Sequence, residues 1–261
     1  MPVVEVDGLV KRYRGSERNS VDDVSFTVAD GSLFCLLGPN GAGKTTTMSI
    51  LTTTLRPTAG RVRIAGHDLA AEQSAIRREL GIVFQQPSLD LNLTAEENLR
   101  IHAVLYNLYP WRPTFGLMPR RYRGQIEELA GVLGVAGSLR RRVSTFSGGM
   151  RRKLEIVRAL MHRPAVLFLD EPTAGLDPES RRSLWDHLRQ TRQEFGTTVF
   201  LTTHYLAEAE SADTVCVIVK GRIVERGTPA DIKSRHAPFQ PRWQLVQPTL
   251  EDAYLHLLDT A

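Results

Sequence analysis

The stretch GPNGAGKT, residues 38–45, decides how the rest of the chain is interpreted. It fits the pattern G-x-x-x-x-G-K-[ST] and directly follows a continuously apolar segment, residues 33–37. Such a segment is typical of a buried strand in a parallel sheet, and a helical pattern follows over about 43–55. The glycines let backbone N–H groups turn inward, and the start of the helix adds partial positive charge. The stretch therefore predicts a phosphate-binding loop between a strand and a helix.

Two side chains carry the chemistry of this loop. Lys44 is expected to reach the β- and γ-phosphates of a nucleotide, and the hydroxyl of Thr45 is expected to ligate Mg²⁺. The residues expected to surround the nucleotide here are Gly38, Pro39, Asn40, Gly41, Ala42, Gly43, Lys44, Thr45 and Thr46.

A second motif, VLFLDE at residues 166–171, ends an apolar strand in two adjacent carboxylates. Ligands gather at the carboxyl ends of strands in open α/β sheets. Asp170 is expected to hold Mg²⁺, and Glu171 to polarise an attacking water as a general base. The alternative is that the two carboxylates only end the strand before a turn at Pro172.

A third motif, Ser147-Gly148-Gly149, stands directly before a helical pattern over 151–162. A hydroxyl, flexible glycines and a helix start form a second candidate anion site. The alternative is an ordinary helix N-cap with flexible glycines.

The order of these three motifs resembles the ATP-binding cassette ATPases, and the resemblance covers about residues 3–227. It implies that Tyr13 stacks on adenine and that Gln85 helps to hold Mg²⁺ and links its occupancy to the helical region. It also implies that Asp177 belongs to the segment called the D-loop and that His204 contacts the γ-phosphate and orients the water.

Each of these four residues also has a structural interpretation. Tyr13 could be a tyrosine of an edge strand, and Gln86 could take the role of Gln85. Asp177 could cap the helix that begins at Pro178, and His204 could be a core or capping histidine.

The resemblance further implies that two copies of the chain bury two ATP molecules head to tail. Ser147, Gly148 and Gly149 then reach the nucleotide held by the partner copy. Met150 stands where the family commonly has Gln, and with the Arg-Arg-Lys that follows it is similar to the subgroup that powers exporters of the daunorubicin-resistance type. Segment 248–255 is similar to the C-terminal tail of that subgroup.

The expected fold is α/β: a P-loop NTPase core with a mostly parallel sheet, an N-terminal antiparallel β subdomain and a helical insertion. Residues 1–227 form the expected ATPase domain, with the helical subdomain inserted at approximately 88–162 and a short extension at 228–261. Residues 94–97 predict a capping box at a helix start. The segment 109–119, with three prolines, is an expected surface loop and an insertion relative to the family.

Composition limits the remaining function classes. The net charge of +4 does not require a nucleic-acid partner, and no apolar run approaches the ~20 residues that cross a bilayer. Cys35 and Cys216 lie in separate apolar runs and are expected to be buried free thiols. With no such run in the sequence, the resemblance implies that the partner is an integral membrane permease on a separate chain, with the ATPase bound peripherally at the cytoplasmic face of the cell membrane.

Two other functions compete with this interpretation. A nucleic-acid machine built on the same cassette is disfavoured because the chain has one cassette and no long heptad repeat. A non-catalytic binding module is disfavoured because Lys44, Asp170, Glu171 and His204 are all present. The basic clusters at 120–123 and 140–142 could face anionic lipid or the permease, or could form a solvated helical face.

Overall fold

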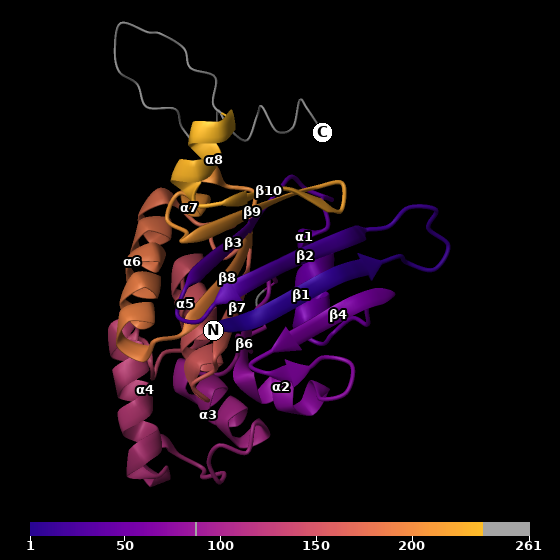
Figure 1. The fold of residues 1–261 in the computed structure, drawn as a ribbon. Coiled ribbons are helices and arrows are strands. Elements are labelled where there is room, and N and C mark those ends of the chain that lie inside the picture. The colour runs from indigo at the N-terminus through magenta and orange to yellow at the C-terminus, as the bar shows by residue number, and fades with distance from the viewer. Residues whose placement is uncertain (87, 237–261) are drawn as a thin grey trace, which may run out of the picture. The chain divides into compact units, whose positions relative to one another are not determined.

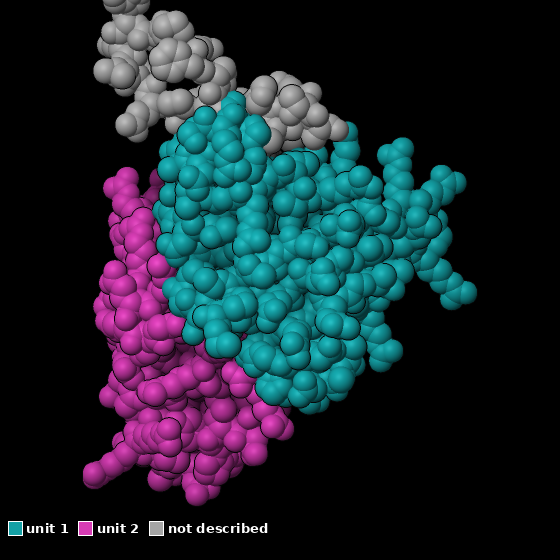
Figure 2. Space-filling model, viewed as in Figure 1, with its two compact units in different colours: residues 1–77, 198–261 teal, residues 78–197 magenta. Residues whose placement is uncertain are grey.

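The computed structural model describes residues 1–86 and 88–236 and forms two compact units (Figures 1 and 2). Unit 1 holds residues 1–77 together with the described residues from 198 onwards, and unit 2 holds residues 78–197. The tail segment 248–255 lies outside the described residues.

Unit 1 begins with an antiparallel sheet in the order β2-β1-β4-β5. Its strands are β1 (Pro2–Lys11), β2 (Val21–Ala29), β4 (Ala59–Ile64) and β5 (His67–Asp68). Buried and exposed residues alternate along β2, as expected for a strand with one face on the core.

The parallel part of unit 1 is built around β3 (Leu33–Leu37), whose five residues are all buried. It pairs in parallel with β8 (Thr198–Thr203) and β9 (Thr214–Val219), while β10 (Arg222–Gly227) is antiparallel to β9. The ring of Phe34 stacks on those of Phe26 and Phe200, with centroids 5.1 and 5.0 Å apart, and joins the antiparallel sheet to β3 and β8. This aromatic core fixes the strand that leads into the phosphate loop.

The helices of unit 1 are α1 (Lys44–Leu51), α7 (Leu206–Ala209) and α8 (Pro229–His236). Helix α1 ends four residues earlier than the sequence pattern predicts. Its C-cap Thr52 donates its hydroxyl hydrogen to the Met48 carbonyl at 2.9 Å, and Thr53 adopts a positive φ of 62°. Thr side chains that bond to nearby carbonyls compete with helix continuation in this way.

Unit 2 contains one parallel strand pair, β6 (Leu80–Val83) with β7 (Val166–Asp170). Its main helices are α3 (Ala95–Leu105), α4 (Arg120–Val132), α5 (Gly148–Leu160) and α6 (Pro178–Phe195). Single 3-10 turns lie at Phe115–Leu117, Ala136–Ser138 and Val143–Thr145. The short helix α2 (Gln73–Glu79) begins in unit 1 and ends in unit 2. It buries only Ile76, which explains why the sequence pattern does not predict it.

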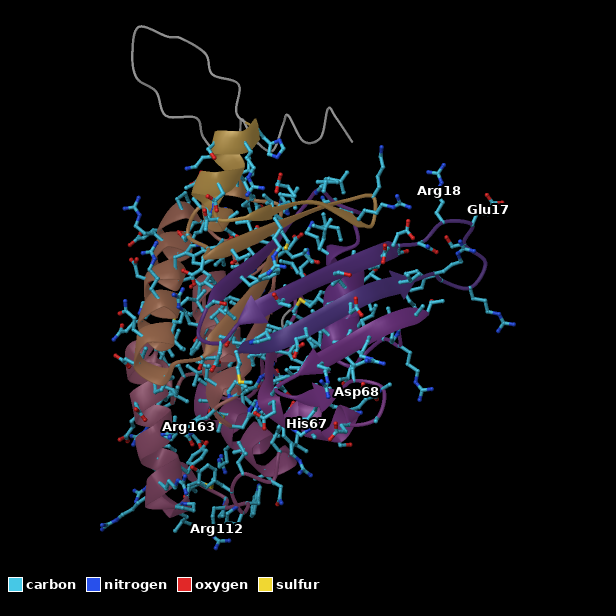
Figure 3. The ribbon with its side chains drawn as sticks, in the orientation of Figure 1. Glu17, Arg18, His67, Asp68, Arg112 and Arg163 are labelled. Atoms are coloured by element: carbon cyan, nitrogen blue, oxygen red, sulfur yellow. The ribbon has the colours of Figure 1, made fainter. Side chains whose placement is uncertain are left out.

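Two local predictions in unit 2 are confirmed. Thr94 and Glu97 form the predicted capping box at the start of α3. The segment 109–119 is a largely exposed loop that includes Arg112 (Figure 3). It is held in place because Arg100 Nη1 donates to the Arg112 carbonyl at 2.7 Å and Tyr109 Oη donates to Gln125 Oε1 at 2.9 Å.

Cys35 and Cys216 are buried and free, as predicted. Burial raises the pKa of the Cys216 thiol to about 12. Among the described residues, no helix combines the length and the apolar character needed to cross a membrane.

Candidate active site

The phosphate loop of unit 1 runs between β3 and α1, as predicted. Gly43 has a φ of 108°, and a Cβ built on it would lie 2.5 Å from the carbonyl oxygen of Ser20. A Cβ on Gly38 would lie 2.3 Å from the carbonyl oxygen of Ile218. Only glycine fits this path at both positions, because a side chain would collide with fixed backbone.

The loop places a cation at a helix start. Lys44 is only 4% exposed, and its Nζ donates to the carbonyls of Gly38 at 2.7 Å and Pro39 at 3.0 Å. Of the residues that the structure describes, none caps the start of α1 with its side chain. The first N–H groups of a helix have no partner inside the helix, so this end favours a bound anion. The arrangement suits the phosphates of a nucleotide.

Tyr13 lies beyond the end of β1, in the loop that continues through Glu17 and Arg18 (Figure 3). The interpretation as an edge-strand tyrosine therefore does not describe its position. Its hydroxyl is 3.3 Å from Thr46 Oγ1, the residue is 44% exposed, and Lys11 Nζ lies over its ring at 5.5 Å from the centroid. The structure thus brings Tyr13 to the first turn of α1, where an exposed aromatic face is available for stacking.

His204 directly follows β8 and is half-buried, with its ring centroid 4.1 Å from that of Tyr205. The preceding carbonyl, of Thr203, accepts a hydrogen bond from the Gly38 N–H at 3.2 Å. Since β3 and β8 are parallel neighbours, the start of the loop and His204 follow adjacent strand ends.

In unit 2, the two carboxylates lie at the end of β7. Asp170 is the last residue of the buried strand, and Glu171 follows it with a φ of 44°. This left-handed conformation is unfavourable for a residue with a side chain and occurs where surrounding contacts enforce it. Gln85 Nε2 donates to Glu171 Oε2 at 3.3 Å, so the structure brings these two predicted residues together.

The residue that the sequence interpretation missed is Arg152, in α5. It is 6% exposed, and its guanidinium donates to the carbonyls of Asp170 at 2.8 Å and Pro172 at 3.0 Å. No local pattern could have identified it, because its partners are distant in sequence.

The third motif lies at the start of α5. Ser147 is the N-cap, and its Oγ accepts a hydrogen bond from the Met150 N–H at 3.2 Å. The N-cap interpretation is therefore correct, but the hydroxyl still has its own hydrogen to donate. Ser147 and Gly148 are exposed, while a Cβ on Gly149 would lie 2.8 Å from Ser180 Oγ.

Asp177 caps α6, where its Oδ1 accepts from the Ser180 N–H at 2.9 Å. Hydrogen bonds from Ser180 lower the pKa of this carboxyl group. The capping interpretation of Asp177 is confirmed, and its exposed position leaves the D-loop role as a prediction.

The proposed Mg²⁺ ligands fit the chemistry of the ion. Thr45 is exposed at the start of α1, and Asp170 and Gln85 bring a carboxylate and an amide oxygen. Mg²⁺ prefers oxygen ligands and is usually held by one or two protein groups together with substrate phosphates and water. The described part of the chain holds no group of three or more His, Cys, Asp or Glu that could hold a metal ion.

Comparisons with known proteins identify the family to which this site belongs. Residues 21–174 match the family described as ABC transporter. The daunorubicin resistance ATP-binding protein DrrA3 of Streptomyces coeruleorubidus is 41% identical over 232 residues, which cover 88% of this chain and 70% of that protein.

Two solved structures are also similar. An ATP-binding subunit of an ABC transporter has a TM-score of 0.79 and 31% identity, with 98% of this chain and 99% of that chain covered. The dimeric post-hydrolysis structure of the ATP-binding cassette MJ0796 with ADP and Pi has a TM-score of 0.74 and 25% identity, covering 86% and 98%. This chain therefore belongs to the ATP-binding cassette (ABC) transporter family, whose ATP-binding domains hydrolyse ATP.

Proposed function

We propose that this chain is the ATPase subunit of an ABC exporter for drugs, antibiotics or lipid-like compounds. The observation that carries the proposal is the buried Lys44 at the uncapped start of α1, inside a loop that only glycines can form. A fixed positive charge beside the N–H groups of a helix start supports binding of the triphosphate of ATP at this loop.

Catalysis in this proposal depends on position and charge, as in phosphoryl transfer generally. Glu171 is the general base for the attacking water, a role worth roughly 10²–10⁴-fold in rate. Gln85, which contacts Glu171, and His204 orient the reacting groups. Thr45, Gln85 and Asp170 hold Mg²⁺, which neutralises charge on the β- and γ-phosphates when bound. Tyr13 stacks on the adenine ring.

We further propose that two copies assemble head to tail, with Ser147, Gly148 and Gly149 directed at the ATP of the partner copy. Support comes from the exposure of Ser147 and Gly148 at a helix start and from the dimeric form of the similar cassette MJ0796. Asp177, exposed at the start of α6, is the proposed D-loop contact.

The proposed membrane partner is a permease on a separate chain, bound at the cytoplasmic face of the membrane. Support comes from the similar structure described as a subunit of a transporter, and export follows the name of the drug-resistance relative. The proposed docking surface is on unit 2, where large apolar side chains are exposed on and beside α3: Leu91, Ile101, Leu105 and Tyr106.

Two experiments test this function. Glu171→Gln should retain ATP binding, reduce turnover by at least ~10²-fold and accumulate an ATP-bound dimer in light scattering. Normal hydrolysis by Glu171→Gln would remove Glu171 as the base. Affinity purification of the tagged chain from detergent-solubilised membranes should recover a protein with several apolar spans, and its reproducible absence would argue against the permease.

A further inference from the structure

The guanidinium of Arg152 contacts the backbone on both sides of Glu171. Its Nε donates to the Pro172 carbonyl at 3.0 Å and its Nη2 to the Asp170 carbonyl at 2.8 Å. Its Nη1 donates to the carbonyl of Phe84, the residue before Gln85. One side chain thus joins the backbones that carry Glu171 and Gln85.

The same face of α5 also holds the segment that follows Gln85. Glu155 is 1% exposed, and its Oε1 accepts from the Ser88 N–H at 2.8 Å while its Oε2 pairs with Arg152 Nη1 at 3.2 Å. Arg158 Nη1 donates to the Ser88 carbonyl at 2.8 Å. Arg152, Glu155 and Arg158 are three residues apart, so they lie along one side of the helix.

Glu171 needs external support for its conformation. Its φ of 44° lies in the left-handed region, which a residue with a Cβ adopts only where the surroundings enforce it. Arg152 fixes the two carbonyls that flank this residue. Fixing these peptide groups keeps the Glu171 side chain directed to Gln85, whose amide it contacts at 3.3 Å.

We propose that Arg152 is a positioning residue, which transmits the placement of the helix beginning at Ser147 to the proposed base Glu171 and to Gln85. The inference rests on the proposed ATPase function and deepens it. Engagement of the Ser147 turn by a partner's nucleotide would thereby be coupled to the geometry of the base in the same chain.

The role depends on arginine and not merely on positive charge. A guanidinium presents five donors in a rigid plane, and Arg152 uses that fork for three carbonyls and one carboxylate. A lysine ammonium is a point charge with three donors and cannot span the same set. Arg152→Lys therefore keeps a charge beside the buried Glu155 while removing the fork.

The first test measures ATP hydrolysis by Arg152→Lys. Misplacement of a reacting group by about 1 Å can cost roughly 10²-fold in rate, so we expect kcat to fall by at least ~10-fold. KM and the affinity for a fluorescent ATP analogue should stay within about twofold, because the phosphate loop is unchanged. The control Arg189→Lys, on the exposed face of α6, should leave both constants unchanged. Equal kcat for Arg152→Lys and the wild type would overturn the inference.

A double-mutant cycle separates positioning from general destabilisation. Because Arg152 is proposed to act through Glu171 and Gln85, adding Arg152→Lys to Glu171→Gln should lower the residual single-turnover rate by a smaller factor than Arg152→Lys lowers the wild-type rate. If the two substitutions reduced the single-turnover rate by independent, multiplying factors, the inference would be overturned, whatever their effect on thermal stability. A different result would refute the proposed function itself: normal ATP hydrolysis by the single variant Glu171→Gln. Arg152→Gln, an uncharged second variant, should show the same lack of additivity if Arg152→Lys does not fold.

Discussion

Helices α1 and α5 both start at a glycine-bearing motif, but the two helix starts are capped differently. Before α1, Gly43 is left-handed, no described side chain caps the helix, and Lys44 is buried against loop carbonyls. Before α5, Ser147 supplies a cap from within the turn and remains exposed. Gly43 has no side chain to accept hydrogen bonds from the first N–H groups of α1, whereas Ser147 accepts one at the start of α5.

This difference indicates that the two helix starts contribute differently to ATP binding. The loop before α1 should supply most of the affinity for ATP within one copy of the chain. The turn before α5 can add a hydrogen-bond donor to a phosphate that another molecule presents. Three of the four predictions below test this contrast and one concerns acid stability in unit 2, and their expected effects become progressively smaller.

The largest effect is expected for Lys44→Ala. Removing one partner of a buried charge contact costs about 2–5 kcal/mol, which corresponds to a roughly 30-fold to several-thousand-fold loss of ATP affinity. Titration with a fluorescent ATP analogue measures it. Ser147→Ala is the matched variant in the other turn, and it should bind the analogue as the wild type does. If the two variants lost the same amount of ATP affinity, the proposed difference between the two helix starts would be wrong.

Glycine substitutions give the second contrast. Gly43→Ala requires a left-handed alanine and a collision with the Ser20 carbonyl, so it should cost more than the ~1–2 kcal/mol of the backbone conformation alone. In Gly148→Ala the added Cβ meets only Leu176 Cδ2, at an ordinary 3.5 Å. Thermal unfolding should show a clear decrease in Tm for Gly43→Ala and little change for Gly148→Ala. A larger decrease for Gly148→Ala would contradict the structure of both turns.

The third prediction concerns acid stability in unit 2. Burial, together with the nearby Arg158 and His162, lowers the pKa of His102 to about 4. The neutral imidazole is favoured in the folded state, so its stabilising contribution is complete above the unfolded pKa of about 6.5 and is lost as pH falls from there toward 4. At pH 5 the free energy of unfolding should therefore be lower by about 1–2 kcal/mol than at neutral pH.

Thermal unfolding at pH 7.5 and pH 5.0 measures this loss. His102→Gln, which cannot titrate, should lose less Tm on acidification than the wild type. A loss of the same size in both proteins would show that His102 does not carry the effect.

The smallest effect on stability is expected for Ser147→Ala. Loss of an N-cap costs about 1 kcal/mol, or roughly 2–4 °C in Tm for a chain of this size. Thr228→Ala removes the matching cap of α8, where Thr228 Oγ1 accepts from the Asp231 N–H at 3.1 Å. Both variants should lose similar stability, but only Ser147→Ala should impair ATP-dependent dimerisation in light scattering. If both variants dimerised poorly, the loss of dimerisation would be caused by lower stability and not by the missing Ser147 hydroxyl.

What could be predicted from the sequence was the local part of the site. The loop at 38–45, the strand ending in Asp170 and the cap at Thr94 are specified by residues close together in the chain, and each was found at its expected place. Short elements with little buried surface, such as α2, gave no periodic signal. Helix α5 begins at Gly148, three residues before the predicted start, because Ser147 caps it directly.

The non-local part of the site could not be predicted in this way. Arg152 binds carbonyls at positions 84, 170 and 172, which only the folded chain brings to one guanidinium. The left-handed conformation of Glu171 likewise has no sequence signal, since glutamate does not favour it. The family resemblance assigned a role to Gln85 in the same site as Glu171, but the hydrogen bond between the two side chains is known only from the structure.

The most direct test of the central claim mixes two defective variants in the Glu171→Gln background, one with Lys44→Ala and one with Ser147→Ala. If one copy's Lys44 and the other copy's Ser147 hold the same ATP, a mixed dimer contains one intact site. Light scattering with ATP should then detect dimers in the mixture and few in either variant alone. If both residues served the same copy's nucleotide, no intact site could form, and a mixture with no more dimer than its components would contradict the account.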